Sequence, residues 1–514
     1  MVTRAIEAIE TAFVRVAQRK MLSILLAGLL PVIARAFLLP ILPIPRPAIQ
    51  DEFSYLLAAD TFAHGRLANP TPALPEHFET LQELIRPVYA SKYPPLPGLV
   101  MAAGQKFTGQ PWIGVWLSMG LFCAVLCWAL QGWLPAVWAL AGSLVAVLHI
   151  GMVSYWTESY WGGTLTAIGG ALLVGAIPRL IERPRISALL TYAAGLAVLA
   201  NTRPFEGFVF ALACSGWLIF RSRNRKQIVL AMALLLAPVA AGMAYYNARL
   251  TGHVLELPYV AHDRQYALLE PVLWDTHVRP QPVYATAALR DFWQADLREK
   301  QKAHRQFLGA HIWDLLLVVR FFIGLPLAMC VLLVARPLWR DPAARFALIL
   351  GAVAYLGPAL DTRVWPHYAA AETVLVYILA ACALRALRNA WDGLDGAYLM
   401  WGALAVFLVP TALGLLSPSN RYLIGSENFL TDAKHSTVEE RLEKLPGRQL
   451  VLVSYGPKHD LYEELVYNRA DIDASKVIWA RSLGPSADRA LIRRYPDRQV
   501  WSLYENGGVT LTCP

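Results

Sequence analysis

The sequence has little of what a disulfide-bonded or metal-binding protein needs. Its 514 residues include six cysteines, and five of these lie inside apolar runs while only Cys513 lies outside. No disulfide framework is therefore available. Histidines, cysteines and acids do not cluster at the spacing of a tightly held metal. The chain also lacks solenoid repeats, heptads and low-complexity tracts, which excludes repeat and coiled-coil architectures.

Charged residues are scarce as well, at 16% of the chain, whereas hydrophobic residues make up 56%. Soluble globular chains are usually about 45–50% apolar, so this composition predicts a membrane protein. The formal net charge is +9. Its basic residues form short clusters between apolar runs instead of one patch, which is typical of cytoplasmic loops, and we expect no nucleic-acid partner.

A helix needs about 20 apolar residues to cross the hydrocarbon core of a bilayer. By this criterion the sequence predicts eleven transmembrane helices, near 21–43, 112–130, 135–153, 164–181, 187–202, 206–220, 228–247, 312–335, 346–360, 367–384 and 396–416. The first span follows a basic N-terminal segment and shows no small-residue cleavage site, so we expect it to be retained.

The basic residues fix the expected orientation. With the N-terminus inside, the cytoplasmic segments contain sixteen Lys and Arg, whereas the short loops 154–163, 201–206 and 361–367 on the other face contain only Arg203 and Arg363. The positive-inside rule favours this orientation. Loop 44–94, long loop 248–311 and the C-terminal region would then be extracytoplasmic.

The fold expected is a polytopic α-helical membrane protein followed by a small α/β domain. We place the membrane domain, which includes both loops, at residues 1–416 and the extracytoplasmic domain at 417–514. The stretches "RQLVLVSY", "KVIWA" and "RQVWSLY" alternate like short β-strands, and "ADRALIRRYP" between them has the pattern of a helix.

Loop 44–94 contains an adjacent acidic pair, Asp51 and Glu52, directly after the proline-rich stretch "PILPIPRP". The prolines should end the first helix. A new helix should start at Asp51, with Asp51 as its cap and Glu52 in its first turn, and lie along the membrane surface. The simplest interpretation is that Asp51 caps this helix and Glu52 complements its dipole.

Two further features of this loop favour a functional role. Lys92 precedes Pro94 and Pro95 in "YASKYPPLPGL", which would hold its ammonium at the membrane interface, either as an anchor or as a ligand of lipid phosphate. The loop is also longer than a connection requires and rich in aromatic residues, among them Tyr55 and Tyr93.

An N-terminal membrane helix, an Asp-Glu pair and a Lys-Pro-Pro-Leu-like element together resemble the GT-C superfamily of membrane glycosyltransferases. The resemblance points to the group of protein O-mannosyltransferases and aminoarabinose transferases (the family 39, PMT-like group). It extends to "YWTESYWGGTLTAIGGALLVGA", "NTRPFEG" and "WPHYAAAETV" and covers most of residues 20–390. The chain departs from the pattern in two ways: Tyr93 is inserted between Lys92 and the prolines, and the acceptor-side loops differ.

The resemblance implies a hexosyltransferase-type enzyme that moves a sugar from a polyprenyl-phosphate carrier to an acceptor hydroxyl, with inversion, on the extracytoplasmic face. The acceptor would be a lipid, a glycan or a protein, and the membrane the inner (plasma) membrane of a bacterium. A carboxylate must take the hydroxyl proton, and Asp51 is the candidate base. Lys92 or Arg203 would stabilise the leaving phosphate. Glu52 would orient the sugar or, with Asp51, hold a weakly bound divalent cation.

Tyr55, Tyr93, Glu158, Arg203 and His367 complete the candidate substrate-binding set. Glu158 lies among aromatic residues that would stack on a sugar or form an interfacial belt. Arg203 has a nearby partner, Glu206, in "NTRPFEG", and His367 is either a phosphate or metal ligand or a structural hydrogen-bonding residue.

Two other functions fit the same features. A transporter or flippase for a lipid-linked glycan would also be polytopic and basic inside, but it should show duplicated halves with matching broken helices, which the sequence lacks. A ligase or polymerase of preassembled glycans shares the chemistry and predicts a large acceptor groove, of which the C-terminal domain would form a wall.

Overall fold

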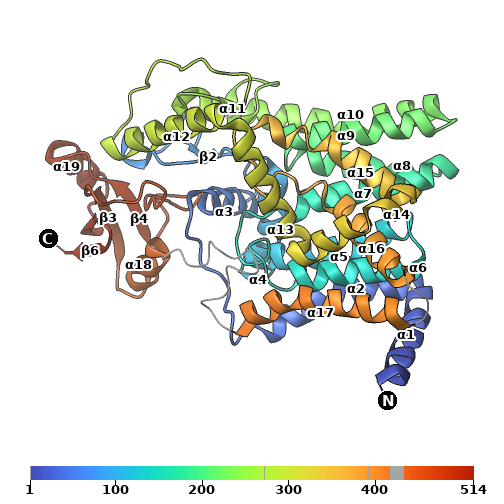
Figure 1. Cartoon of the computed structure of the whole chain (residues 1–514). Helices are drawn as coiled ribbons and strands as arrows, with labels where there is room; N and C mark the ends of the chain where they lie inside the picture. Colours follow the sequence, from blue (N-terminus) through green and yellow to red (C-terminus); the bar gives the residue numbers. More distant parts are fainter. Residues whose placement is uncertain (1, 271, 391–393, 417–432, 514) are drawn as a thin grey trace.

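The computed structural model describes residues 2–270, 272–390, 394–416 and 433–513. A bundle of helices forms the larger part of the molecule, and the C-terminal sheet packs at one end of it (Figure 1). The protein is therefore a mainly helical membrane protein with a small C-terminal sheet domain.

The first half of the chain consists mainly of helices, with one irregular loop between α3 and α4. Its helices are α1 (Val2–Gln18), α2 (Lys20–Phe37), α3 (Gln50–Ala63), α4 (Pro95–Thr108), α5 (Trp112–Leu130), α6 (Ala136–Ala146), α7 (Thr164–Glu182), α8 (Ile186–Ala200), α9 (Pro204–Arg221) and α10 (Arg225–Thr251). Shorter elements are η1 (Pro75–Phe78), β1 (Glu83–Leu84), β2 (Ala90–Ser91) and η2 (Val147–Gly151).

The second half adds the long loop, five bundle helices and the sheet. Its helices are α11 (Pro258–Tyr266), α12 (Ala287–Arg305), α13 (Phe307–Leu333), α14 (Ala335–Arg340), α15 (Pro342–Ala354), η3 (Pro358–Leu360), α16 (Thr373–Asn389), α17 (Leu394–Leu416), α18 (Lys434–Glu443) and α19 (Pro485–Arg494). Its strands are β3 (Arg448–Tyr455), β4 (Val477–Arg481), β5 (Arg498–Glu505) and β6 (Val509–Thr512).

Within the described residues, six helical segments are long and apolar enough to cross a bilayer: α2, α5, α7, α10, α13 and the stretch from α15 to η3. Four other predicted spans coincide with α6 and η2, α8, α9 and α16, which are shorter or more polar, and the fifth coincides with the 23-residue α17. The protein is thus an integral membrane protein, and the count of eleven crossings stays a prediction.

Two predicted spans are placed differently in the structure. The first was expected to reach residue 43, but α2 ends at Phe37, because prolines follow from Pro40 onward and cannot donate to a helical ladder. The span expected from 367 begins at Thr373 instead, since residues 364–372 form turns.

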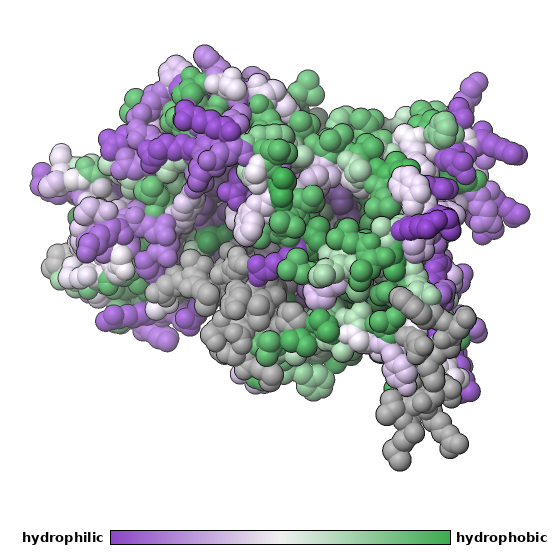
Figure 2. All heavy atoms as spheres, in the orientation of Figure 1, coloured by the Kyte–Doolittle hydropathy of each residue, from purple (hydrophilic) through white to green (hydrophobic). Residues whose placement is uncertain are grey.

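A hydrophobic band separates two hydrophilic ends of the molecule (Figure 2). The basic segments before α8 and α10, together with α14, lie at one end, and α3, α11, α12 and the C-terminal sheet lie at the other (Figure 1). The segments that the sequence analysis assigned to opposite faces thus lie at opposite ends of the bundle, and which end is cytoplasmic stays a prediction.

The C-terminal sheet has the strand order β4-β3-β5-β6. Strand β3 pairs in parallel with β4 and β5, and β6 runs antiparallel to β5. The predicted strands and the predicted helix coincide with β3, β4, β5 and α19. The domain boundary predicted at residue 417 lies outside the described residues.

Helix α3 lies against α4 through a close backbone approach. A Cβ added at Gly98 of α4 would come within 2.6 Å of the Cβ of Ala58 on α3, so only glycine fits there. The side chain of Ser54 on α3 also donates to the carbonyl of Gln82 at 2.6 Å and lies 2.8 Å from the hydroxyl of Ser91. These contacts fix α3 against the segment that contains Lys92.

Candidate active site

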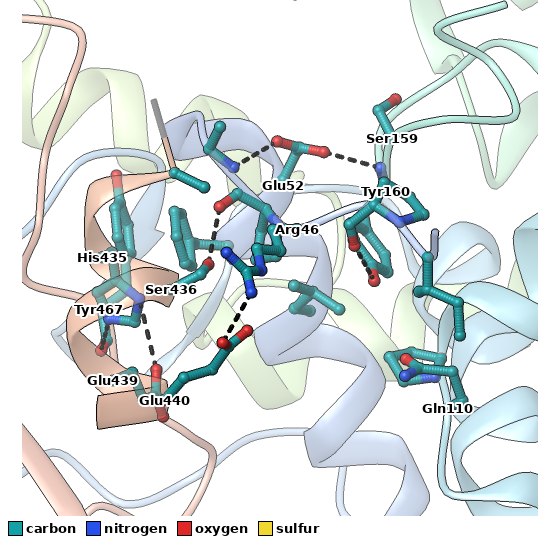
Figure 3. Close-up of a pocket in the computed structure, with 18 of the residues that line it drawn as sticks. Arg46, Glu52, Gln110, Ser159, Tyr160, His435, Ser436, Glu439, Glu440 and Tyr467 are labelled. Carbon is teal, nitrogen blue, oxygen red and sulfur yellow. Dashed lines mark hydrogen bonds and ion pairs between the residues drawn. The ribbon is translucent and has the colours of Figure 1, made fainter. Parts of the chain in front are cut away.

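The two acids of the Asp51-Glu52 pair serve different parts of the structure. Consecutive side chains on a helix point about 100° apart. Glu52 is buried at the start of α3. Its Oε2 accepts hydrogen bonds from the N–H groups of Ala48 at 2.8 Å and Ile49 at 3.2 Å, and its Oε1 accepts from the N–H of Tyr160 at 3.1 Å. One carboxylate thus joins the proline-rich segment, α3 and the loop before α7 (Figure 3).

The N-cap of α3 differs from the one predicted from the sequence. Helix α3 begins at Gln50 with Ile49 as its N-cap, so Asp51 is not the capping residue. Glu52, three residues after the cap, reaches back to the free amide of Ile49 as in the acidic half of a capping box. Helix α3 is also buried on most of its surface, so it is not an amphipathic helix lying free on a membrane.

The surroundings of Glu52 favour the neutral, protonated form of its carboxyl group. Burial raises the pKa of Glu52 from 4.5 to about 7, although the three backbone N–H groups lower it. Asp51 raises it further, because two neighbouring carboxylates repel each other.

Asp51 instead faces aromatic residues. It is half-buried, and its Oδ1 accepts a short hydrogen bond from the hydroxyl of Tyr93. The ring of Tyr93 is stacked on that of Tyr55, with centroids 4.3 Å apart. Burial, followed by the charge of Asp51, raises the pKa of Tyr93 well above its usual value, so its hydroxyl stays a donor at neutral pH. The tyrosine inserted into the Lys-Pro-Pro-Leu-like element therefore contacts the candidate base directly.

Arg203 belongs to the same cluster. It precedes α9, its Nη1 lies 3.4 Å from Oε1 of Glu206, and its guanidinium lies 4.5 Å from the ring centroid of Tyr368. The ion pair predicted within "NTRPFEG" is thus present, but at a distance that is long for a hydrogen bond. The charges of Arg203 and Asp51 both act on Tyr55, whose pKa burial raises to about 12. The cation and the candidate base therefore both lie near Tyr55.

Lys92 reaches toward the long loop. Its Nζ lies 3.5 Å from Oδ1 of Asp263 on α11 and 5.6 Å from the ring centroid of Tyr93. Burial and then the Lys92 charge lower the pKa of His262 to about 4, so neutral His262 donates its Nδ1–H to Asp263 at 2.9 Å. Although burial opposes it, Lys92 and His262 together hold the pKa of Asp263 below its usual value. Sequence analysis missed Asp263, because only the fold brings it next to Lys92.

Glu158 is a buried structural partner in the structure. Its carboxylate accepts two hydrogen bonds from Arg35 of α2, at 2.5 and 2.8 Å, and Arg35 also donates to the carbonyl of Leu42 at 2.8 Å. Removing one member of such a pair costs roughly 3–5 kcal/mol because it leaves a buried charge. The single arginine in the apolar run before the prolines was the signal that sequence analysis overlooked.

His367 is buried among aromatic residues. Its Nδ1 lies 3.1 Å from the hydroxyl of Tyr155, and its ring contacts Trp161 and Tyr368 with centroids 4.6 and 4.7 Å away. These neighbours match the structural alternative given for this residue. Within the residues that the structure describes, no group of three or more His, Cys, Asp or Glu is arranged to hold a metal ion.

A cavity of about 1240 Å³ lies on the Glu52 side of α3 (Figure 3). Its walls come from the proline-rich segment, α3, the loop before α7, α18 and the C-terminal sheet, and Asp51 does not line it. Arg46, which lines it, is paired with Glu440 at 2.8 Å. The polar groups Gln110, Ser159 and Glu158 also border it, beside apolar residues such as Leu42. Helix α3 thus separates this cavity from the cluster around Asp51.

Comparison with known proteins finds no matching family model and no matching curated protein. Two similar solved structures are of ArnT from Cupriavidus metallidurans. The one bound to undecaprenyl phosphate is 13% identical over 96% of this chain and 92% of that chain, with a TM-score of 0.48, and the apo form is 15% identical with a TM-score of 0.46. A third is the Archaeoglobus fulgidus oligosaccharyltransferase tethered with an acceptor peptide, 9% identical over 85% of this chain and 62% of that chain, with a TM-score of 0.48.

Proposed function

We propose that the protein is a membrane glycosyltransferase that moves a sugar from a polyprenyl-phosphate carrier to an acceptor hydroxyl. The observation that carries the proposal is the joint placement of a half-buried carboxylate, Asp51, and two cations, Arg203 and Lys92, around the Tyr55–Tyr93 stack. Inverting transfer needs one carboxylate to accept a proton and a positive charge to stabilise the departing phosphate.

The reaction is a single displacement. The acceptor oxygen attacks the anomeric carbon, its proton passes to Asp51, and the bond between the anomeric carbon and the phosphate oxygen breaks. The electron pair leaves with the lipid phosphate, toward Arg203 and Lys92. Tyr93 donates to Asp51 and thereby fixes the orientation of the carboxylate. No metal ion is required in this scheme.

The location follows from the distribution of charge. Helix α3, which contains Asp51, strand β2, which precedes Lys92, and the C-terminal sheet lie at the end of the bundle opposite the basic segments before α8 and α10 (Figure 1). Under the positive-inside rule that end is extracytoplasmic, and we place the protein in the inner membrane of a bacterium, where polyprenyl-phosphate sugars are presented on the outer face.

A glycan ligase or polymerase is the second candidate, because it shares this chemistry. The cavity of about 1240 Å³ lies on the other side of α3 from Asp51, so its size does not distinguish the two candidates. In both candidates Asp51 activates the acceptor hydroxyl, and the candidates differ in the size of the group transferred and of the acceptor.

The test is Asp51→Asn in purified protein reconstituted with a panel of undecaprenyl-phosphate hexoses and with acceptor-containing membrane extract. Release of undecaprenyl phosphate is the measured quantity. Loss of a general base should reduce turnover by about 10²- to 10⁴-fold. The melting temperature should change little, because Asp51 is half-buried and does not cap α3. Wild-type turnover in folded Asp51→Asn would remove Asp51 from this role.

A further inference from the structure

The C-terminal sheet does not sit on the membrane domain as a separate module. One buried hydrophobic cluster contains Leu57 and Ile85 from the first loop together with Leu450 and Ile478 from β3 and β4. The hydroxyl of Tyr89 adds a hydrogen bond to the carbonyl of Asn468 at 2.9 Å. The sheet and the loop that contains Asp51 therefore share a core.

The most direct link to α3 is an aromatic stack. Phe53, two residues after Asp51, lies parallel to Tyr467, with ring centroids 4.3 Å apart and an interplanar angle of 3°. Both rings are almost fully buried, and His435 of α18 contacts Phe53 edge-on at 4.7 Å. Such stacked pairs stabilise a structure beyond the area that they bury.

Hydrogen bonds hold both ends of α3 to the C-terminal part of the chain. The hydroxyl of Ser436 donates to the carbonyl of Pro47, three residues before the helix, at 3.0 Å. In the last turn, Oδ2 of Asp60 accepts from the N–H of Ala470 at 2.8 Å. The sheet thus contacts α3 at its start, its middle and its end.

We propose that the C-terminal sheet holds α3 in the position that catalysis requires, with Tyr467 as a positioning residue that acts on Asp51 through Phe53. This role rests on the proposed function of Asp51. A misplacement of about 1 Å at a reacting group can cost about 10²-fold in rate. Although α3 contacts the segment that contains Lys92, the ion-pair partners of Lys92 and Arg203 lie outside α3. Displacing α3 should therefore affect turnover more than donor binding.

The experiment compares three variants in reconstituted full-length protein. Tyr467→Leu removes the stack. Tyr467→Phe keeps the ring and removes only the hydroxyl, which lies near the side chain of Thr80. Trp501→Leu is the control: Trp501 lies on β5, which β3 separates from β4, and its Nε1 bonds within the sheet to Gln449 at 2.7 Å.

The measurements are kcat and KM for the undecaprenyl-phosphate hexose, melting temperature, and hydrogen exchange of the amides in 50–63. We expect Tyr467→Leu to lower kcat at least tenfold, to leave KM within twofold and to speed exchange in α3. Tyr467→Phe should match the wild type. Trp501→Leu should lower the melting temperature without changing exchange in α3 or kcat of the folded fraction.

The inference is overturned if Tyr467→Leu keeps the kcat and the hydrogen exchange of the wild type, or if Trp501→Leu loses as much kcat and as much protection of α3 as Tyr467→Leu does. The exchange measurement does not depend on the reaction. If the wild type turns over none of the donors, the proposed function fails, whereas faster exchange in α3 for Tyr467→Leu alone still supports the holding contact.

Discussion

Replacing Glu52 with glutamine should change the pH dependence of stability in a defined direction. Glu52→Gln preserves the size of the side chain and removes its titration. The oxygen of the glutamine side chain can still accept hydrogen bonds. The NH₂ group of the same side chain must face at least one of the N–H donors of Ala48, Ile49 and Tyr160. At low pH Glu52 is protonated, and its hydroxyl oxygen can still accept a hydrogen bond whereas the glutamine NH₂ group cannot. Leaving a buried N–H group without an acceptor costs about 1–3 kcal/mol, so the variant should be less stable than the wild type at low pH.

The sign of the pH effect follows from the raised pKa. Folded Glu52 has a pKa of about 7 against 4.5 for the free side chain. The folded state therefore binds the proton more tightly than the unfolded state, and the stability linked to Glu52 is fully present below pH 4.5 and is lost as the pH rises toward 7. Between pH 5.5 and 8 this loss amounts to about 2 kcal/mol. The advantage of the wild type over Glu52→Gln should shrink by that amount.

The assay is hydrogen exchange of the amides in 48–60, measured for both proteins in nanodiscs at pH 5.5 and 8 after correction for intrinsic rates. Comparing the two proteins at each pH cancels the titration of other buried carboxyls, such as Asp361, whose pKa burial also raises to about 7. An advantage of the wild type that is constant or grows with pH would refute the reasoning. It would show that the three N–H groups outweigh burial and keep Glu52 ionised.

Three other predictions test the remaining parts of the site. Lys92→Met is made together with Asp263→Asn so that no unpaired carboxylate is left, and it should impair donor use about ten- to more than a hundredfold. Lys92→Arg should recover part of this loss if the ammonium binds phosphate, whereas full recovery by arginine would indicate an anchor. Tyr93→Phe keeps the stack on Tyr55 and removes the hydrogen bond to Asp51, which should lower kcat roughly tenfold, and unchanged kcat would contradict an orienting role. A reporter fused to the C-terminus should be extracytoplasmic, and a cytoplasmic signal would overturn the assigned orientation.

Hydropathy was sufficient to locate the helices but not their ends. The spans at 112–130 and 164–181 agree with α5 and α7 within one residue, because apolar composition and length decide such helices. Ends that depend on prolines or on packing, as at Phe37 and Thr373, were misplaced by about six residues. Tertiary contacts set these boundaries, and a hydropathy window does not register them.

The site was predictable only where local sequence determined it. Asp51, Lys92 and Tyr93 lie in one loop, and their proximity followed from motif and spacing. The partner of Lys92, Asp263, lies 171 residues away. The partner of Glu158, Arg35, lies 123 residues away. Such pairs require the fold, so the sequence suggested a sugar ligand for Glu158 where the structure shows a buried ion pair.

The different directions of Asp51 and Glu52 affect how related sequences should be compared. Helix α3 is a partition, with the candidate base directed to one side and the carboxylate that ties three segments together directed to the other. An acidic pair in a relative would therefore represent two independent constraints, one from chemistry and one from folding. A relative with Asp-Gln at these positions could keep the reaction with a less stable loop, whereas one with Asn-Glu would keep the architecture and lose the reaction. A single-residue insertion between the proline-rich segment and α3 would turn the helix by about 100°, which would direct Asp51 to where Glu52 now points and Glu52 to where Phe53 now points.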